Sequence, residues 1–579
     1  MKKYGFNNIK ELFLSILPAQ IFSFVTSSLS GIVNGIIIGN YLTSLDMIAL
    51  GFTSPIVQIM SVFSTVVSAG ARIVCGRFIG RGDKEKVNDA FSNSINLLVI
   101  IGAILTAICF FLAKPIASII SNADALEKTT LYLRGISIGI LPTLIVPCLM
   151  VFLQMRNQNT YALVSTAVLA VSNLSLGLLA MSVLKTNIFG VGLVTSISQY
   201  ITLVFIIIRY ITVKDLPHYK KVSEKLYKEI IIIGIPTALV NLLYALRNST
   251  LNTYAANHYG NEAVNALSIL NSSCGPIDAV NIGVGQVALM LASVAIGEKD
   301  KESLTAVGKV SMLCGVILGL TKMILIFAFG EYLVSAFGAT GSVKELSRAL
   351  YNAYSLSMPL NMITNVLTNT YQSFGKVKYC NILFALTAYI FPILFVYLLG
   401  NIWGINAIFY NYALSEVFIL TVIYVYACIK KKHIITNLQD LLVMDNELEV
   451  GNHITITIKT IDEVVEVSKR IQDYCLSENV DSKKAMIAGL CAEEIAGNIV
   501  EHGFTKSKKK NKAIDIFADV DGEDINIRIK DNAVAFDPHI KIDQSDDPSV
   551  NIGIKMVSKL AKDMNYQNTF GLNVLSIRL

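Results

Sequence analysis

Three short segments near the end of the chain carry residues that could bind a nucleotide. The first, GLCAEEIAGNIVEHGF, places Glu494, Asn498 and His502 at successive intervals of four residues, close to one turn of a helix. On a helix the first two would face one direction, so an amide and a carboxylate could hold Mg2+ and position a water or hydroxyl. His502 is either part of this site or a hydrogen-bonding residue near the helix end.

The second and third segments supply the other parts of such a site. DNAVAFDP begins with Asp531 directly after a strand pattern, and an aspartate there could accept a hydrogen bond from an adenine amino group. In NIGIKMV, Gly553 opens a predicted helix whose free N–H groups could receive phosphate. Together the three segments predict a site for a nucleotide with Mg2+.

The surrounding pattern predicts an α+β domain that positions these segments. HITITIKT alternates like a half-buried strand, and TIDE (Thr460 to Glu463) forms a capping box for an amphipathic helix. Asp481 is expected to cap the helix that carries the first segment. AIDIFADV and INIRIK are predicted strands joined by a tight turn, followed by a helix over NIGIKMVSKLAKDM and a closing strand NVLSIRL. We expect a small antiparallel sheet with helices on one face, an α+β sandwich.

The rest of the chain is too apolar for a soluble protein. Of its 579 residues 53 % are hydrophobic and 16 % charged, whereas about 25 % charge is typical of soluble domains. A helix needs about 20 apolar residues to cross a bilayer, and we count twelve such segments before residue 430, including 229–257 and 263–296. The sequence therefore predicts a polytopic α-helical membrane protein.

The membrane part contains an internal repeat. GRGDKE at 80–85 recurs as GEKDKE at 297–302, and Pro142 recurs as Pro359, both at an offset of 217 residues. Because the repeated unit has six helices, the two copies are parallel, and transporters of this build bind substrate between their halves. The predicted organisation is two six-helix lobes, a linker and a soluble domain, at residues 1–215, 216–432, 433–450 and 451–579.

Lysine and arginine in the short loops set the orientation. They gather on one side of the membrane, for example at Arg77, Arg81, Lys299 and Lys430, and are sparse on the other side. Positive loops face the cytoplasm. We therefore expect a plasma membrane protein of a bacterium with both termini in the cytoplasm, where ATP is found.

The first 430 residues resemble the MATE family, the multidrug and toxic compound extrusion transporters. The resemblance lies in NGIIIGNYLTSLDMIAL of the first hairpin, GRGDKEKVNDAF, IGIPTAL and the second motif GEKDKE. It implies two lobes around a central cavity. It also implies export of small amphipathic, often cationic, molecules in exchange for Na+ or H+.

The residues that could couple transport to an ion lie mainly in the second lobe. Where many members of the family carry an aspartate in the first span, this chain has Asn34, whose repeat counterpart is Asn252. Arg247, Asp278 and Glu416 fall inside predicted spans, where an ionisable group costs about 3 kcal/mol or more and is a functional hypothesis by default. Either Arg247 and Asp278 neutralise one another, or Asp278 or Glu416 couples transport to an ion.

Residues 450–579 resemble the GHKL ATPases, with the end GIKMVSKLAKDMNYQNTFGLNVLSIRL most similar to the anti-sigma-factor serine kinases. The resemblance implies that Asn498 ligates Mg2+, Glu494 is the catalytic base and Asp531 reads adenine. Two positions depart from the family pattern. Ala533 replaces a glycine, and the third segment has the single glycine Gly553 where a pair of glycines is common. The predicted ATP-binding residues are Asn498, His502, Asp531, Ala533, Phe536, Gly553 and Ile554.

The combined prediction is a multidrug exporter with a cytoplasmic ATP-binding regulatory or serine/threonine kinase-like domain. A kinase of this type would act on a cytosolic, anti-anti-sigma-like protein. The alternatives are a membrane sensor-kinase, whose transporter-like part senses a ligand, and a lipid or glycan flippase. The chain has no GxxxxGK[ST] loop, which argues against an ABC-type motor, and no phosphoacceptor-histidine helix pair. We expect no nucleic-acid partner.

Overall fold

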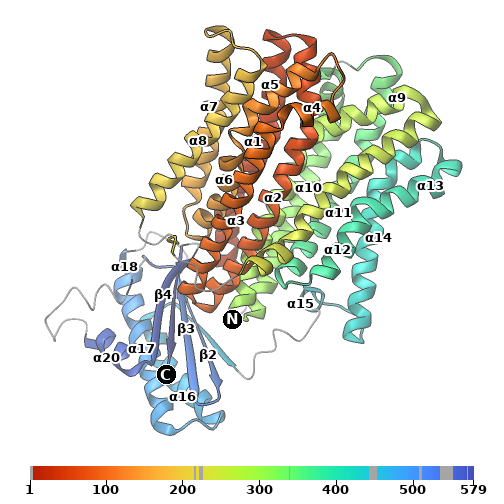
Figure 1. The fold of residues 1–579 in the computed structure, drawn as a ribbon. Coiled ribbons are helices and arrows are strands. Elements are labelled where there is room, and N and C mark those ends of the chain that lie inside the picture. The colour runs from red at the N-terminus through yellow and green to blue at the C-terminus, as the bar shows by residue number, and fades with distance from the viewer. Residues whose placement is uncertain are drawn as a thin grey trace.

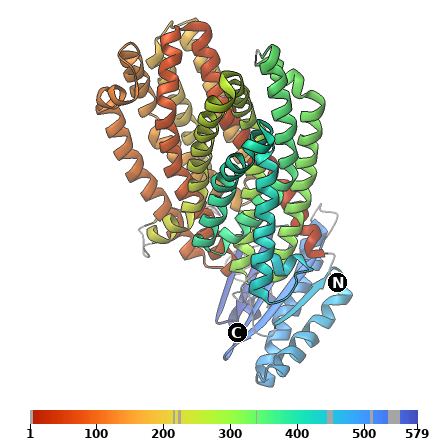
Figure 2. The ribbon, with the colours of Figure 1, turned by 90° about the vertical axis from the view of Figure 1, so that its right-hand side faces the viewer.

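A computed structural model gives the arrangement of both parts of the chain (Figure 1). It describes residues 4–213, 217–220, 226–337, 339–442, 453–506, 512–534, 537, 552–569 and 571–579. Apolar helices form one bundle, and the C-terminal domain lies at one end of it (Figures 1 and 2). We call this the domain-side end of the bundle.

The first lobe is an array of long apolar helices with two short ones. Its elements are α1 (Tyr4–Tyr41), α2 (Ser44–Arg81), α3 (Lys84–Phe111), α4 (Ala113–Ile120), α5 (Leu126–Ser137), α6 (Ile140–Met155), α7 (Asn159–Ser182) and α8 (Ile188–Thr212). The start of α2 has a capping box between Thr43 and Asp46, and its end has Gly82 in the left-handed conformation (φ 77°). Such a cap ends a helix cleanly, so α2 and α3 are joined by a sharp turn.

The second lobe has the same general plan. Its elements are α9 (Tyr227–Gly297), α10 (Lys301–Ala336), α11 (Gly341–Ser373), α12 (Val377–Ala385), η1 (Leu386–Ile390), α13 (Phe391–Trp403) and α14 (Asn406–Lys431). The long element α9 is two helices, because Gly260 has the non-helical angles φ 77° and ψ −173°. This break falls between the spans predicted at 229–257 and 263–296.

The helices account for twelve membrane spans. Among the described residues nine helices are long and apolar enough to cross a membrane, and the pair α5 and α6, bent by 43°, makes a tenth. The break in α9 adds one more span. The remaining one is α11, which is more polar than the other spans and whose buried residues include Ser355, Thr364, Thr368 and Asn369. The predicted fold class, a helical membrane protein with a C-terminal α+β domain, is confirmed.

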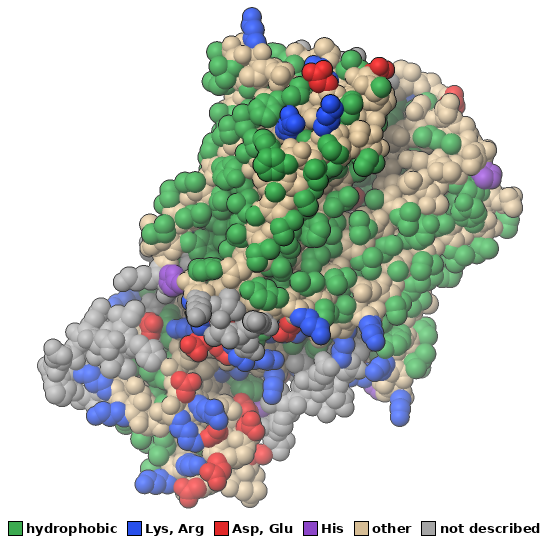
Figure 3. All heavy atoms as spheres, in the orientation of Figure 1, with side chains coloured by type: hydrophobic (Ala, Val, Ile, Leu, Met, Phe, Trp, Pro, Cys, Tyr) green, Lys and Arg blue, Asp and Glu red, His purple; other side chains and the backbone are tan. Residues whose placement is uncertain are grey.

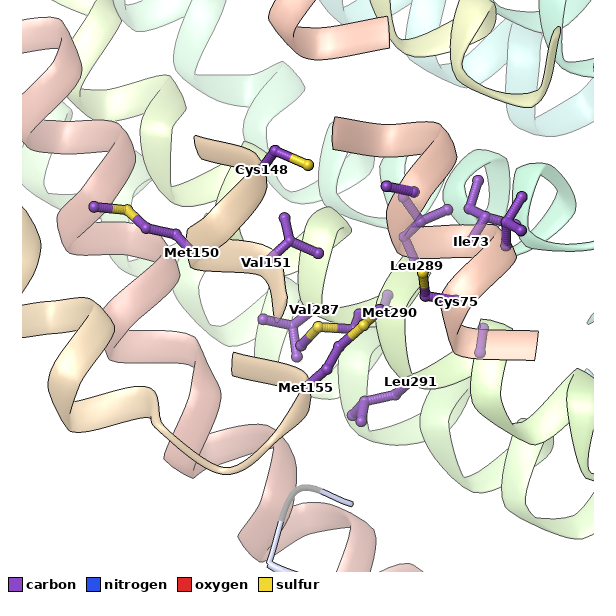
Figure 4. Close-up of a cluster of buried hydrophobic side chains, with 14 of the residues drawn as sticks. Ile73, Cys75, Cys148, Met150, Val151, Met155, Val287, Leu289, Met290 and Leu291 are labelled. Carbon is purple, nitrogen blue, oxygen red and sulfur yellow. The ribbon is translucent and has the colours of Figure 1, made fainter. Parts of the chain in front are cut away.

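The two lobes share one apolar core. Side chains of α2 and α6 from the first lobe meet α9 of the second (Figure 4). The labelled members are Ile73, Cys75, Cys148, Met150, Val151, Met155, Val287, Leu289, Met290 and Leu291. The nine cysteines of the chain are free, and seven of them are buried.

The lobes touch backbone to backbone near the domain-side end. A Cβ atom added to Gly297, the last residue of α9, would lie 2.8 Å from Cα of Arg77 on α2 and closer still to its carbonyl oxygen. A Cβ added to Gly70 would lie 2.7 Å from the carbonyl carbon of Ile230. Real Cβ atoms do not come this close, so only glycine allows these contacts. The bundle is therefore tightly closed between α2 and α9 at this end.

The C-terminal domain is a five-stranded antiparallel sheet covered by helices. Its elements are β1 (His453–Ile458), α16 (Ile461–Ser477), α17 (Ser482–Asn498), η3 (Ile499–Gly503), α18 (Phe504–Lys506), β2 (Ile514–Asp521), β3 (Asp524–Asp531), α20 (Ile552–Leu560), β4 (Asp563–Thr569) and β5 (Leu572–Arg578). The strand order is β1-β2-β3-β5-β4. Alternate residues such as Ile525, Ile527 and Ile529 point to the helices and form a core separate from that of the bundle. Charged side chains gather on this part of the surface, whereas apolar ones cover the bundle (Figure 3).

Local sequence signals placed most of these elements correctly. The capping box of Thr460 and Glu463 is present, and the Asp481 side chain accepts a hydrogen bond from the Lys483 backbone N–H at 3.0 Å. One prediction is wrong, because the helix expected to run through Met564 ends at Leu560. The segment DMNYQNT instead forms β4, whose Met564 and Tyr566 point into the core as the partner strand of β5.

Candidate nucleotide site and a buried polar network

Glu494 and Asn498 lie one turn apart on α17 and are joined by a hydrogen bond. The Asn498 Nδ2 donates to Oε1 of Glu494 at 2.7 Å and to the Glu494 carbonyl at 2.8 Å. Both side chains are partly exposed. Since the amide uses its nitrogen for these bonds, Oδ1 is the Asn498 atom suited to ligate a metal.

His502 does not continue α17. It lies in the π-helical turn η3 and its side chain is exposed. A π turn widens the helix and changes the register of the residues that follow. The same turn brings Gly503 beside the second segment, where a Cβ added to Gly503 would lie 2.9 Å from the Cβ of Ala533.

Asp531 lies at the end of β3 in a buried polar cluster. Its Oδ1 accepts hydrogen bonds from the Ala533 backbone N–H and from Nδ2 of Asn573, both at 2.8 Å. Asn573, on β5, in turn accepts from the Tyr566 hydroxyl at 2.8 Å and from Asn568 at 2.9 Å. Sequence reasoning missed Asn573. The available signal was an amide at an inward-pointing position of the closing strand.

Gly553 joins the first and third segments. It lies in the first turn of α20, and a Cβ added there would lie 2.7 Å from Cγ of Glu494 and closer still to the carboxylate. Ile554 is buried in the domain core, 3 % exposed. Phe536 lies outside the described residues. The structure thus gathers Glu494, Asn498 and Gly553, and it places Ala533, whose backbone N–H bonds to Asp531, beside η3.

The donor set fits Mg2+ that arrives with a phosphate. In the part of the chain that the structure describes, no three His, Cys, Asp or Glu side chains come together as a metal site. Mg2+ commonly takes one or two protein oxygens and completes its shell with phosphate and water. Asn498 could provide such an oxygen, and Gly553, in the first turn of α20, lies against the Glu494 carboxylate of the same site.

The ionisable residues of the second lobe do not form the simple pair that neutralisation would give. Both carboxylate oxygens of Asp278 accept from the Tyr354 hydroxyl, at 2.9 and 3.1 Å. The Arg247 guanidinium instead lies over the rings of Tyr244 and Tyr412, 4.8 and 4.9 Å from their centroids. Among the described residues no direct ion pair joins Arg247 and Asp278.

Glu416 belongs to a chain of hydrogen bonds that ends on a lysine. Its Oε1 accepts from Asn361 at 2.7 Å, and Asn361 accepts from Asn281 at 2.8 Å. The Nζ of Lys322 donates to Asn281 Oδ1 and, at 3.4 Å, to the carbonyl of Ile277. Lys322 was missed in the sequence, although a lone lysine in the apolar run VILGLTKMILIFAFG was a signal for it.

The two asparagines related by the repeat are placed less completely. Asn34 lies within α1, and its side chain is outside the described residues. Asn252 lies on α9, and its Oδ1 is buried without a hydrogen-bond partner in the described part of the chain. The structure therefore places the second-lobe transport candidates on α9 and α14, and the side chain of the first-lobe candidate lies outside the described residues.

Comparison with family profiles gives matches over both parts of the chain. The MatE profile matches twice, at residues 19–179 and 236–398, and the two starts are 217 residues apart, the offset of the internal repeat. The profile described as histidine kinase-like ATPase domain matches residues 459–579.

Curated relatives and solved structures match the membrane part. The multidrug export protein MepA of Staphylococcus haemolyticus is 25 % identical over 411 residues, covering 69 % of this chain and 89 % of that protein. MepA of Staphylococcus saprophyticus is 22 % identical over 406 residues, with the same coverage. A MOP superfamily transporter from Pyrococcus furiosus has a TM-score of 0.66 at 16 % identity, over 72 % of this chain and 94 % of that one. An outward-facing multidrug resistance MATE family transporter gives 0.65 at 17 % identity, over the same shares.

Proposed function

This chain belongs to the MatE family, whose profile matches more than half of it, and from that premise we propose that its membrane part is a multidrug exporter. Its substrates would be small amphipathic, often cationic, molecules. The relatives named as multidrug export proteins support this proposal. Export would be an antiport in which Na+ or H+ moves the other way.

The buried network of the second lobe supports cation coupling. Asp278 and Glu416 are two acids at membrane depth, and each is held by neutral hydrogen-bond donors, Tyr354 and Asn361. Lys322 supplies a positive charge at the other end of the network from Glu416. A cation that reached either carboxylate would change the charge balance of this lobe, which is the requirement for coupling.

We further propose that the C-terminal domain binds Mg-ATP. The observation that carries this proposal is the contact of Glu494 with both Asn498 and Gly553, which joins the predicted base, metal ligand and phosphate cradle in one place. Asn498 would ligate Mg2+, Glu494 would accept the proton of the attacking group, and Asp531 would accept from the adenine amino group. The domain would act as a nucleotide sensor for the transporter or as a serine/threonine kinase of the anti-sigma type. A kinase of that type would have an anti-anti-sigma-like target.

The proposed setting is the plasma membrane of a bacterium, with both termini in the cytoplasm. The domain-side end of the bundle carries Arg77, Arg81 and Lys299, as the positive-inside rule requires of a cytoplasmic face. ATP is therefore on the side where the domain would need it.

Nucleotide titration of the full-length protein in lipid nanodiscs tests the ATP proposal. We expect Mg-ATP to bind the wild type and Asn498→Ala to weaken binding by about tenfold or more, because a metal ligand is lost. Lys483→Ala, an exposed change on the same helix, is the matched control and should bind as the wild type does. No binding to wild-type protein, or equal affinity in Asn498→Ala, would refute the assignment.

A sensor-kinase is the second candidate function, favoured by the amide at Asn34 where a titratable acid would serve coupling. Drug export by full-length protein and by a truncation after Lys432 separates the two. Export that survives truncation supports the exporter. Lack of export from both proteins, when each is present in the membrane, supports the sensor.

A further inference from the structure

The sheet of the C-terminal domain has a polar face that points away from its helices. On β3, Ile527 and Ile529 are buried in the domain core, so Arg528 and Lys530 point to the opposite side. We call this side the outer face of the sheet. It also includes Asn565 and Gln567 of β4 and Ser576 of β5, and it meets the domain-side end of the bundle (Figure 1).

The outer face binds the end of α2 in the first lobe. The Gln567 side-chain amide donates to the carbonyl of Ile79, and that of Asn565 donates to the carbonyl of Gly82. Both carbonyls belong to the last turn and cap of α2, which ends at Arg81. The Ile79 carbonyl also accepts from the Gly82 backbone N–H of the cap at 3.0 Å, so the sheet adds a second donor there. At the Gly82 carbonyl the sheet supplies a donor from outside the helix.

The same face binds the end of α9 in the second lobe. Arg528 donates to the carbonyl of Glu298 at 2.9 Å, and Lys530 forms an ion pair with the Glu298 carboxylate at 2.7 Å. Glu298 is the residue that follows α9 and is 5 % exposed. Burial alone would lower the pKa of Lys530, but the carboxylates of Glu298 and Asp300 raise it above its ordinary value. Lys530 is therefore charged, and a cation at a helix C-terminus is favourable.

The two docking points lie at helix ends that are equivalent in the repeat, although the residues contacted there differ. The end of α2 carries GRGDKE and the end of α9 carries GEKDKE, 217 residues further on. A single sheet thus holds the same helix end in both lobes. The chain also enters the domain from the second lobe, where α15 (Leu438–Leu442) packs Leu442 on Gly308 and accepts a hydrogen bond from Tyr371 at Leu441.

We propose that the outer face of the sheet is a clamp that holds the two lobes together at the cytoplasmic end and links their separation to the nucleotide site. An exporter of this build exposes its cavity to the cytoplasm when its lobes part there. In the structure α2 and α9 are in backbone contact, and the clamp connects those two helices. Opening to the cytoplasm then requires the contacts of the clamp to release on at least one lobe.

The nucleotide site lies on the other side of the same strand. Asp531 is the neighbour of Lys530 on β3 and points to the helix side, where it bonds to Asn573. A nucleotide that moves Asp531 therefore moves the strand that carries the clamp. By linkage, any effect of Mg-ATP on the clamp is matched by an equal effect of lobe separation on Mg-ATP affinity. This part of the inference rests on the proposed function.

Distances between the lobes test the clamp in the full-length protein. Spin labels at Glu85→Cys and Glu302→Cys would report on exposed repeat-equivalent positions of the two lobes, with Cys314 and Cys428, the two cysteines that are not buried, replaced by serine. In nanodiscs we expect Lys530→Glu to increase the long-distance population at least threefold. Glu298→Lys with Lys530→Glu should restore the wild-type distribution, because the ion pair is remade in reverse. Lys469→Glu, an exposed change on α16, should have no effect.

The outcomes separate the clamp from the nucleotide proposal. An unchanged distribution in Lys530→Glu, or a double variant as open as the single one, overturns the clamp whatever the nucleotide result. Mg-ATP binding measured on the same samples, with no change in the distances on binding, overturns the link between the two sites. If the wild type does not bind Mg-ATP, the proposed function fails, and the charge-exchange result still decides the clamp.

Discussion

The carboxylate of Glu494 fills the space beside Gly553. The first residue lies on α17 and the second in the first turn of α20, and a side chain at position 553 would overlap the acid. A segment that is 59 residues further along the chain thereby fixes how the predicted base is held. The relationship means that Gly553 is required for space, in addition to any role in phosphate binding.

Gly553→Ala should therefore disturb the nucleotide site. The added methyl group would force Glu494 or the start of α20 to move, at a cost of about 1–3 kcal/mol. We expect Mg-ATP affinity to fall about tenfold or more, measured by titration of the full-length protein. Gly497→Ala is the control on α17, because among the described residues its Cβ would meet Val464 alone, at 3.9 Å, and helix propensity favours alanine. Equal binding in both variants would contradict the role of the cradle.

Lys322→Met should abolish most gradient-driven export. The change removes the positive charge from the network that reaches Glu416 and leaves buried polar groups without their partner, and breaking such an arrangement typically costs about 3–5 kcal/mol. Transport into vesicles under a proton or sodium gradient is the measurement. Lys309→Met lies on the exposed side of the same helix α10 and should transport normally. Full activity of Lys322→Met would remove the network from coupling.

Gly297→Ala should loosen the contact between the lobes. Its Cβ would collide with the backbone of Arg77, so α9 and α2 would have to separate at the domain-side end. We expect a Tm several degrees below that of the wild type, from an overpacking cost of about 1–3 kcal/mol. Gly51→Ala, on α2, is the control, because in the described part of the chain no atom lies within 4 Å of its added Cβ. A wild-type Tm for Gly297→Ala would show that the two helices are not held this closely.

The ion pairs of Asp524 predict a pH-dependent stability of the C-terminal domain. Hydrogen bonds from Lys562 and Arg578 lower the pKa of Asp524 from 3.8 to about 2. A carboxylate whose pKa is lower in the folded than in the unfolded state stabilises the fold at pH values above its unfolded-state pKa. This stabilisation is lost as the pH falls through the folded-state pKa. Asp524→Asn should thus lower the calorimetric Tm at pH 7, and the difference should shrink between pH 4 and pH 2. The effect is small because the ion pairs are partly exposed to solvent. Asp473→Asn, exposed on α16, is the control, and a difference that does not change with pH would contradict the assignment.

Most of the membrane fold could be predicted from the lengths of the apolar segments alone, because a helix that crosses the hydrocarbon core must be long and apolar. The break at Gly260 and the repeat offset were also visible in the sequence, and the MatE profile matches at the same offset. Strand β4 was not visible. DMNYQNT is too polar to stand out, and pairing with β5 rather than propensity makes it a strand.

In the candidate sites, too, local contacts could be predicted from the sequence and contacts between distant segments could not. Glu494 and Asn498 are neighbours on one helix, so their contact follows from spacing. The contacts of Glu494 with Gly553, of Asp531 with Asn573 and of Lys530 with Glu298 join distant segments, and no periodic pattern encodes them. Lys322 is different, because a single lysine in an apolar helix is a visible signal for a charge inside the membrane, and this signal was overlooked.

The polarity of α11 bears on how the protein is made. A helix with so many serine, threonine and asparagine residues gains little by entering lipid alone, and the translocon inserts segments largely by their individual hydrophobicity. Its polar groups find partners on neighbouring helices, as when Asn361 meets Asn281 of α9 and Glu416 of α14. We therefore expect α11 to integrate stably into the membrane only together with α9 and α14, whose side chains partner its polar groups.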